Sequence, residues 1–167
     1  MKRLHNYLYG APAYVHWMKQ VRALTLVSTS PRRRELLEKY VPELRVVPPK
    51  AVESHVRNPD DLVANARRKL ESACLAPGVI GVSADTAVFL DGRAIGKPTS
   101  RSKSVEVLES LSGRWHEVAT GVALLCDGRI DTASETTRVR FRKLERETIR
   151  AYVATGEPLD KAGGYGI

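Results

Sequence analysis

The chain has 167 residues, 43% hydrophobic and 28% charged, so it can bury the core of one domain and its composition excludes a disordered protein. The formal net charge is +8, but half of this excess comes from residues 1–23, which hold four Lys and Arg residues and no acid. The remaining excess suits a polyanionic small substrate as well as nucleic acid, and no stretch approaches the roughly 20 apolar residues of a membrane span.

Residues 1–23 are basic and aromatic, and they lack the continuous apolar core and small-residue cleavage site of a signal peptide. We expect either an N-terminal extension of a domain at residues 24–167 or a mis-assigned start, because Met18 stands just before the first predicted strand. The two cysteines, Cys74 and Cys126, lie far apart in no metal-ligand spacing. A reduced, cytoplasmic protein is the simplest interpretation, and a structural disulfide is the alternative.

The chain begins its regular structure with a strand followed by a helix. Leu24–Ser28 is a short apolar run typical of a strand. Ser30 is placed to cap the helix that follows, and Pro31 fits its first turn, where a missing N–H costs nothing. The buried side of this helix would consist of Leu36, Leu37 and Tyr40.

After a second strand in LRVVP, the pattern predicts one more helix and then mainly strands. Asn58 caps a helix expected to run to about Ala76, and Val79–Val82 forms a buried strand. Asp-Gly pairs at 91–92 and 127–128 fall between apolar runs and indicate hairpin turns. The remaining elements are strands at Ala87–Leu90, Arg93–Ile95, Trp115–Cys126 and Ile130–Phe141, and helices at Ser100–Leu111 and Glu145–Ala154. Crossover helices together with hairpins predict an α/β domain with a mixed central sheet and flanking helices.

Small hydroxyl residues and arginines follow the first strand, in Ser28–Arg34. A strand that turns into a helix there would present backbone N–H groups and the positive end of the helix dipole, which suits phosphate. Arg32 and Arg33 would add forked donors that match phosphate oxygens. The alternative is a solvated basic helix face, and this segment by itself favours neither interpretation.

A carboxylate follows the buried strand at Asp85, where burial without a partner is costly. It could be a metal ligand or the general base for water, or it could accept backbone N–H bonds in a structural role. Glu53 gains interest as a second carboxylate, because a hard cation such as Mg²⁺ takes oxygen ligands. Lys69 and Lys97 could each hold a phosphate as a point charge, and either one taken singly is more often a solvated lysine.

Four glycines lie between residues 156 and 166 and predict a loop whose backbone closely approaches a neighbour. A flexible surface loop is the alternative. The sequence has no G-x-x-x-x-G-K-[ST] phosphate loop, and no G-x-G-x-x-G follows a strand, so neither a P-loop nor a dinucleotide mechanism is supported. The G-x-S-x-G, H-E-x-x-H and paired C-x-x-C patterns are also missing from the sequence.

In combination, these clusters resemble the Maf family of nucleotide pyrophosphatases. The series SPRR, ADT, GKP and TGEP-DKAG-YGI is highly specific, and the matching segments occur in family order over nearly everything from Leu24 to Ile167. These segments are LVSTSPRRRELL, ESHV, NARRKLESA, VSADTAVFLDGRAIGKP, LESLSGRWHEVATGVAL, TTRVRFRKL and YVATGEPLDKAGGYGI. The resemblance implies a fold like that of the inosine triphosphate pyrophosphatases, with the substrate in a cleft between two lobes.

The resemblance also implies a hydrolase that cuts a nucleoside triphosphate to its monophosphate and pyrophosphate. Asp85 would accept the proton of the attacking water, and Glu53 with Asp85 would hold a divalent cation, Mg²⁺ or Mn²⁺. Asp85-Thr86 resembles the group that cleaves dTTP and UTP, whereas the 7-methyl-GTP group typically has Asp-Gln there, so Arg32 and Thr86 would influence base choice. The residues implied in substrate and phosphate binding are Ser30, Arg32, Arg33, Lys69, Thr86, Lys97, Asp160 and Lys161.

The sequence departs from the family pattern at both ends. The extension before Val21 is not a family feature, and the chain stops at Ile167, where the family continues with Gln-Gly, a helix and a strand. We therefore expect lower stability and poorer substrate discrimination than in an extended chain.

The expected partner is the nucleotide substrate, with no membrane or nucleic acid, and the resemblance makes a homodimer an expectation as well. Two other interpretations compete with an enzyme. One is a catalytically weak regulator of cell division and septum formation, a role also attached to this family. The other is a nucleic-acid-binding module, which the basic balance prompts but which lacks aromatic residues along a basic stripe.

Overall fold

The computed structural model describes residues 21–166, so most of the predicted N-terminal extension and Ile167 lie outside the described residues. Within residues 21–166 the chain divides into two compact units, and each is described by itself. Unit 1 consists of residues 21–52, 68–83 and 123–131, and unit 2 consists of residues 53–67, 84–122 and 132–166.

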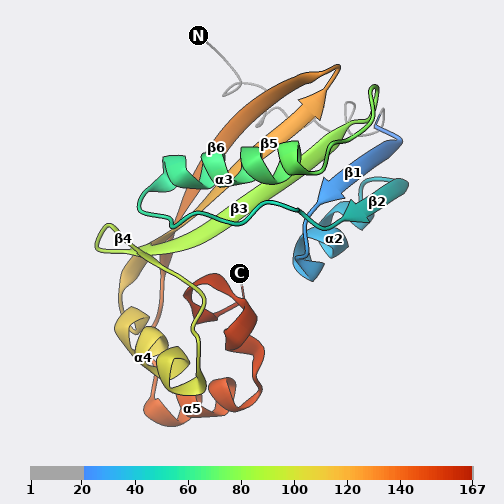
Figure 1. Cartoon of the computed structure of the whole chain (residues 1–167). Coiled ribbons are helices and arrows are strands. Elements are labelled where there is room, and N and C mark those ends of the chain that lie inside the picture. The colour runs from blue at the N-terminus through green and yellow to red at the C-terminus, as the bar shows by residue number, and fades with distance from the viewer. Residues whose placement is uncertain (1–20, 167) are drawn as a thin grey trace, which may run out of the picture. The chain divides into compact units, whose positions relative to one another are not determined.

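Within the described residues, six strands belong to one mixed sheet with the order β2-β1-β3-β5-β6, and β4 pairs with β3 (Figure 1). β1 is parallel to both β2 and β3, whereas β4 is antiparallel to β3. The strands are β1 (Ala23–Val27), β2 (Glu43–Val47), β3 (Gly81–Leu90), β4 (Arg93–Ile95), β5 (Trp115–Cys126) and β6 (Arg129–Arg140). The predicted α/β class with a mixed sheet is therefore confirmed.

Helices and short 3-10 turns connect or follow these strands (Figure 1). They are α2 (Pro31–Glu38), α3 (Pro59–Ser72), α4 (Arg101–Leu111), α5 (Arg146–Ala154), η1 (Glu157–Asp160) and η2 (Ala162–Gly164). Both predicted hairpin turns are present, and their residues have the positive φ angles that a tight two-residue turn requires: 51° and 74° at Asp91-Gly92, and 49° and 75° at Asp127-Gly128.

Strand β3 continues without a break through the segment in which the sequence predicted the end of a strand. The prediction that one strand ends at Val82 and another begins at Ala87 is wrong. Burial alternates along β3, with Ser83, Asp85 and Ala87 buried and the residues between them partly exposed. Asp85 therefore lies in the middle of a strand, on its buried face. A hydrogen bond from Asn65 of α3 makes this burial possible.

Helix α2 is present as predicted, but its predicted buried side is not buried. No side chain of α2 is buried, although the helix lies wholly within the described residues, and Leu36 and Tyr40 expose 55% and 53% of their surface. The predicted buried side is therefore wrong for Leu36 and Tyr40, and Leu37 is only partly buried. Val41, just after the helix, is buried instead. The apolar contact of this short and highly charged segment with the core is therefore made by the residue that follows it.

Two apolar clusters organise unit 2. The first joins α4 and α5 to strands β3 and β5 and consists of Val88, Val107, Leu108, Leu111, Val118, Ile149, Val153 and Tyr165. The second joins α3 to the opposite side of the same strands and consists of Leu62, Ala87, Phe89 and Ala119. Since Val88 and Val118 belong to one cluster and Ala87 and Ala119 to the other, strand alternation assigns each cluster to its own face of the sheet.

Candidate active site

Asp85 and Asn65 form a buried polar pair between β3 and α3 in unit 2. Asp85 exposes 7% of its surface and Asn65 only 1%. The Asn65 Nδ2 group donates to the Asp85 carboxylate over 2.8 Å. A hydrogen bond to an ionised acceptor is stronger than one between neutral groups, so this contact offsets part of the cost of burying the carboxylate.

The same Asn65 amide also holds the segment that contains Glu53. The backbone N–H of Ser54 donates to Asn65 Oδ1 over 3.0 Å, and Asn65 Nδ2 donates to the Ser54 carbonyl oxygen over 3.1 Å. Ser54 directly follows Glu53, whose side chain is exposed. One amide thus fixes both Asp85 and the backbone beside the second carboxylate of the predicted metal site.

The donor chemistry of these two carboxylates suits a hard divalent cation. Within residues 21–166 no group of three or more His, Cys, Asp and Glu residues is placed to hold a metal ion. Mg²⁺ commonly binds through one or two carboxylates while water and substrate phosphates fill its other positions. Glu53 and Asp85 therefore fit a cation that binds together with the substrate, and they do not fit a cage made of protein ligands alone.

Thr86 does not share the face of Asp85. Adjacent residues of a strand point to opposite faces, and the Thr86 hydroxyl lies 3.0 Å from the Thr120 hydroxyl on β5. Asp85 meets Asn65 on the α3 side instead. The influence of Thr86 on base choice remains a prediction, and the structure does not bring its side chain beside that of Asp85.

The glycine-rich C-terminal segment is an ordered loop of unit 2, as its close packing shows. Gly163 has a φ of 67°, and a Cβ at this position would lie within 3.2 Å of three side-chain carbons of Val88. The Gly163 N–H also donates to the Gly96 carbonyl oxygen over 3.3 Å. The predicted close approach of the backbone is confirmed, and it brings the loop beside the exposed Lys97.

Two side chains of this loop, Lys161 and Tyr165, hold it in place through hydrogen bonds. Lys161 exposes 8% of its surface and donates from Nζ to the Glu157 carbonyl oxygen and to Asp160 Oδ1, both over 2.8 Å. The Tyr165 hydroxyl lies 2.6 Å from His116 Nε2 on β5, and burial raises the pKa of Tyr165 to about 12. Lys161 and Asp160, which were predicted as a substrate-binding pair, thus form an ion pair that shapes their own loop.

The remaining predicted site residues belong to unit 1. Ser30 occupies the N-cap position of α2 without making a side-chain cap hydrogen bond, and its N–H donates to Ser28 Oγ over 3.1 Å. Arg32 is exposed and Arg33 partly buried, whereas Lys69 on α3 exposes only 4% of its surface. Since they belong to unit 1 and Asp85 to unit 2, the convergence of these residues on Asp85 stays a prediction.

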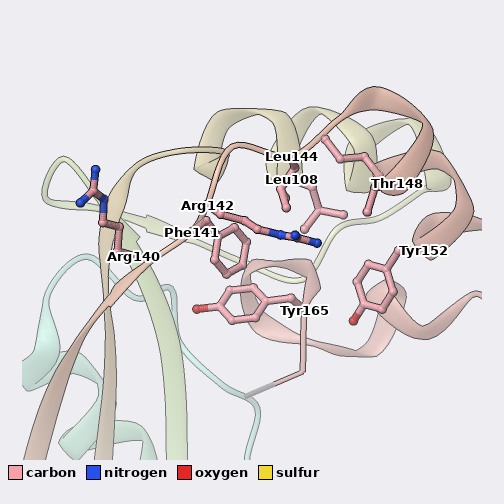
Figure 2. Close-up of a pocket in the computed structure, with 9 residues that line it drawn as sticks. Leu108, Arg140, Phe141, Arg142, Leu144, Thr148, Tyr152 and Tyr165 are labelled. Atoms are coloured by element: carbon pink, nitrogen blue, oxygen red, sulfur yellow. The ribbon is translucent and has the colours of Figure 1, made fainter.

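A separate hollow of about 400 Å³ lies in unit 2 and involves none of the predicted site residues within the described chain (Figure 2). It lies among α4, the end of β6 and α5, and Figure 2 shows the Arg142 side chain extending across it toward Tyr152. Its wall is mainly apolar and consists of Leu108, Arg140, Phe141, Arg142, Leu144, Thr148, Ile149, Tyr152 and Tyr165. The predicted phosphate chemistry therefore does not belong to this hollow.

Sequence reasoning missed Asn65, although the pattern of α3 contains a signal for it. Asn65 lies on the buried stripe formed by Leu62, Ala66 and Leu70. An amide within an apolar stripe needs hydrogen-bond partners, so its position alone indicates a polar contact beneath the helix.

The mixed sheet and the buried carboxylate beneath α3 define an α/β protein with a hydrogen-bonded acid held on the sheet. The chain belongs to the Maf family, because residues 23–167 match the family model described as Maf-like protein. No helix within residues 21–166 combines the length and the apolar character that crossing a membrane requires.

Similar proteins carry a consistent description. The chain is 43% identical over 145 residues to the dTTP/UTP pyrophosphatase of Thermococcus gammatolerans, which covers 86% of this chain and 78% of that protein. It is 45% identical over 151 residues to the dTTP/UTP pyrophosphatase of Symbiobacterium thermophilum, with 88% and 78% covered. Among solved structures, the Ham1 protein of Staphylococcus aureus aligns with a TM-score of 0.49 and 12% identity over 71% of each chain. The resemblance to the Maf family is confirmed by the family match and the sequence relatives.

Proposed function

We propose that this protein hydrolyses dTTP and UTP to the nucleoside monophosphate and pyrophosphate. Membership of the Maf family supports this function, as do the relatives named dTTP/UTP pyrophosphatase that share 43% and 45% of their aligned residues with it. The observation that carries the proposal is the buried Asp85 carboxylate, which an amide on α3 holds in one position. A fixed carboxylate of this kind can act as a general base.

The reaction assigns one proton transfer to Asp85. Its carboxylate accepts a proton from a water molecule as the water oxygen bonds to the α-phosphorus. The bond from that phosphorus to the α–β bridging oxygen breaks, and pyrophosphate leaves with the electron pair. Because phosphoryl transfer depends mainly on positioning and charge neutralisation, the base has to be held still relative to the phosphate.

Cations have to balance the charge of the triphosphate in this proposal. Arg32 and Arg33 would bind phosphate oxygens with their forked guanidinium groups, and Lys69 and Lys97 would act as point charges. Ser30 would add a hydroxyl at the start of α2, and the loop of Asp160 and Lys161 would bound the site beside Lys97. A divalent cation held by Glu53 and Asp85 would, when bound, neutralise and orient the phosphates.

The test is a panel of nucleotides assayed for release of pyrophosphate and monophosphate in the presence of Mg²⁺. The panel contains dTTP, UTP, CTP, GTP and 7-methyl-GTP. We expect dTTP and UTP to be the best substrates, with D85N lowering turnover by about 10²- to 10⁴-fold because an amide cannot accept the proton. D60N is the matched control, since Asp60 is an exposed acid in the first turn of α3.

Three results would contradict the proposal. Preference for 7-methyl-GTP would overturn the substrate assignment, and near-normal turnover by a folded D85N protein would remove Asp85 from the reaction. Lack of pyrophosphate release from every nucleotide would instead favour the catalytically weak regulator.

A further inference from the structure

We infer that Asn65 is a positioning residue for Asp85, an inference that rests on the proposed role of Asp85 as the general base. Asn65 links three parts of unit 2: helix α3, strand β3 and the segment at Ser54. Its contribution would be to fix the direction of the Asp85 carboxylate rather than to touch the substrate.

The hydrogen bonds of Asn65 determine which way its amide faces. A side-chain amide has one oxygen that accepts and one NH₂ group with two protons to donate. The Ser54 N–H donates to Asn65 Oδ1 over 3.0 Å. The NH₂ group then faces the Ser54 carbonyl oxygen at 3.1 Å with one proton and the Asp85 carboxylate at 2.8 Å with the other.

The reversed amide is excluded by the same neighbours. A flip would bring Oδ1 against the Asp85 carboxylate and the Ser54 carbonyl, so that acceptors would face acceptors, and it would bring the NH₂ group against the Ser54 N–H. The Ser54 backbone therefore acts as a template that presents one donor to Asp85. Both amide protons are used, so Asn65 satisfies its donors completely although it exposes only 1% of its surface.

Packing alone does not account for an asparagine at this position. The buried face of α3 combines the apolar residues Leu62, Ala66 and Leu70 with the polar residues Asn65 and Lys69. A leucine has the same number of side-chain heavy atoms without the desolvation cost of an amide, and its helix propensity is higher. What only the amide supplies is the pair of links to Ser54 and Asp85, which also tie the base to the backbone that follows Glu53.

The test compares N65L, N65D and N58A by steady-state kinetics across pH and by thermal unfolding. N65L removes these three hydrogen bonds while keeping the number of side-chain heavy atoms. N65D keeps an acceptor for the Ser54 N–H but opposes the Asp85 carboxylate with a second carboxyl group. N58A is the matched control, because Asn58 is an exposed amide directly before α3 whose Oδ1 accepts from the Asp61 N–H.

We expect N65L to lower kcat by about 10- to 100-fold with KM within about threefold, as is typical when the partner of a catalytic or ligating carboxylate is removed. N65D should move the acid limb of the kcat/KM profile upward by about one pH unit or more, because two adjacent carboxyl groups share a proton. N58A should lower the melting temperature while leaving kcat and the pH profile unchanged. Wild-type kcat and pH profile in N65L and N65D would overturn the inference, and so would a loss of kcat in N58A equal to that in N65L.

A second measurement separates failure of this inference from failure of the proposed function. The Asp85 carboxyl carbon, assigned in the NMR spectrum by comparison with D85N, is titrated in the wild-type protein and in N65D. A titration displaced to higher pH in N65D, with no pyrophosphate released by the wild type, would retain the Asn65 contact and reject the function. Pyrophosphate release together with an unchanged titration would reject the positioning role and retain the function.

Discussion

Gly121 is the position at which helix α3 comes closest to the sheet, and replacing it by alanine should separate the two. A Cβ at Gly121 would lie 2.5 Å from the Leu62 carbonyl carbon and 2.8 Å from its oxygen, and closer still to the Val63 nitrogen. Ordinary contacts of a Cβ begin at 3.4 Å. Because all three neighbours are backbone atoms, no side chain can turn away, and α3 would have to retreat by about 1 Å in a close-packed interior.

The expected cost is about 3 kcal/mol, at the upper end of the range for added methyl groups in well-packed cores. For a domain of this size, that loss corresponds to a fall in melting temperature of roughly 6 to 12 °C. The retreat would also lengthen the hydrogen bond of 2.8 Å between Asn65 and Asp85, because Asn65 follows Val63 on the same helix. Pyrophosphate release per folded molecule should therefore fall as well.

The assay combines thermal unfolding followed by circular dichroism with single-turnover pyrophosphate release at a temperature where G121A is folded. G96A is the matched control, because a Cβ at Gly96 meets no atom within 4 Å and its φ is not in the left-handed region. G96A should melt within about 2 °C of the wild type, since substitutions that create no clash usually change stability by less than about 0.5 kcal/mol. A melting temperature for G121A equal to that of G96A would refute the close contact between α3 and β5.

Four further outcomes are expected. Burial lowers the pKa of His116, so as pH falls the histidine is protonated in the unfolded chain before it is protonated in the folded chain. The free energy of unfolding should therefore decline below about pH 6.5. Urea titrations of H116Q should lack this decline. Burial raises the pKa of Tyr165 to about 12, so its contribution to stability should persist to about pH 10 and then decline. Y165F should make the alkaline decline shallower, and the part that remains would come from groups such as Tyr152, whose pKa burial also raises. K161M removes two partly buried hydrogen bonds from the C-terminal loop and should make residues 155–166 the first site of limited proteolysis. Cleavage of residues 155–166 at the wild-type rate would contradict that role. Excess EDTA should stop turnover and added Mg²⁺ restore it, and full activity in EDTA would remove the divalent cation from the proposal.

Local signals in the sequence were sufficient wherever the structure depends on the backbone conformation of a few residues. The two Asp-Gly turns were predicted because a tight hairpin demands positive φ, which this pair adopts at little cost. The glycines of the C-terminal loop were predictive for a similar reason, since Gly163 packs its Cα directly against Val88. In both cases the cause lies within the segment itself.

Local sequence patterns gave wrong predictions where the conformation of a segment depends on residues elsewhere in the chain. The polar run at 83–86 predicts the end of a strand, because a buried carboxylate within a strand violates the usual apolar pattern. The partner that permits it, Asn65, is 20 residues away and belongs to a helix. Likewise, the leucines of α2 have the spacing of a buried face, but the fold provides little for that helix to cover.

The position of the base and the close approach of the helix depend on each other. An asparagine side chain is short, and it reaches the Asp85 carboxylate because the backbone of α3 at Leu62 and Val63 touches β5 at Gly121. A larger residue at 121 would hold the helix farther off, and a longer amide at 65 would lose the Ser54 backbone as its template. The missing side chain at Gly121 is thus part of what allows Asp85 to be buried in mid-strand with a fixed donor. In this arrangement the geometry of the proposed base follows from the packing of the helix on the sheet.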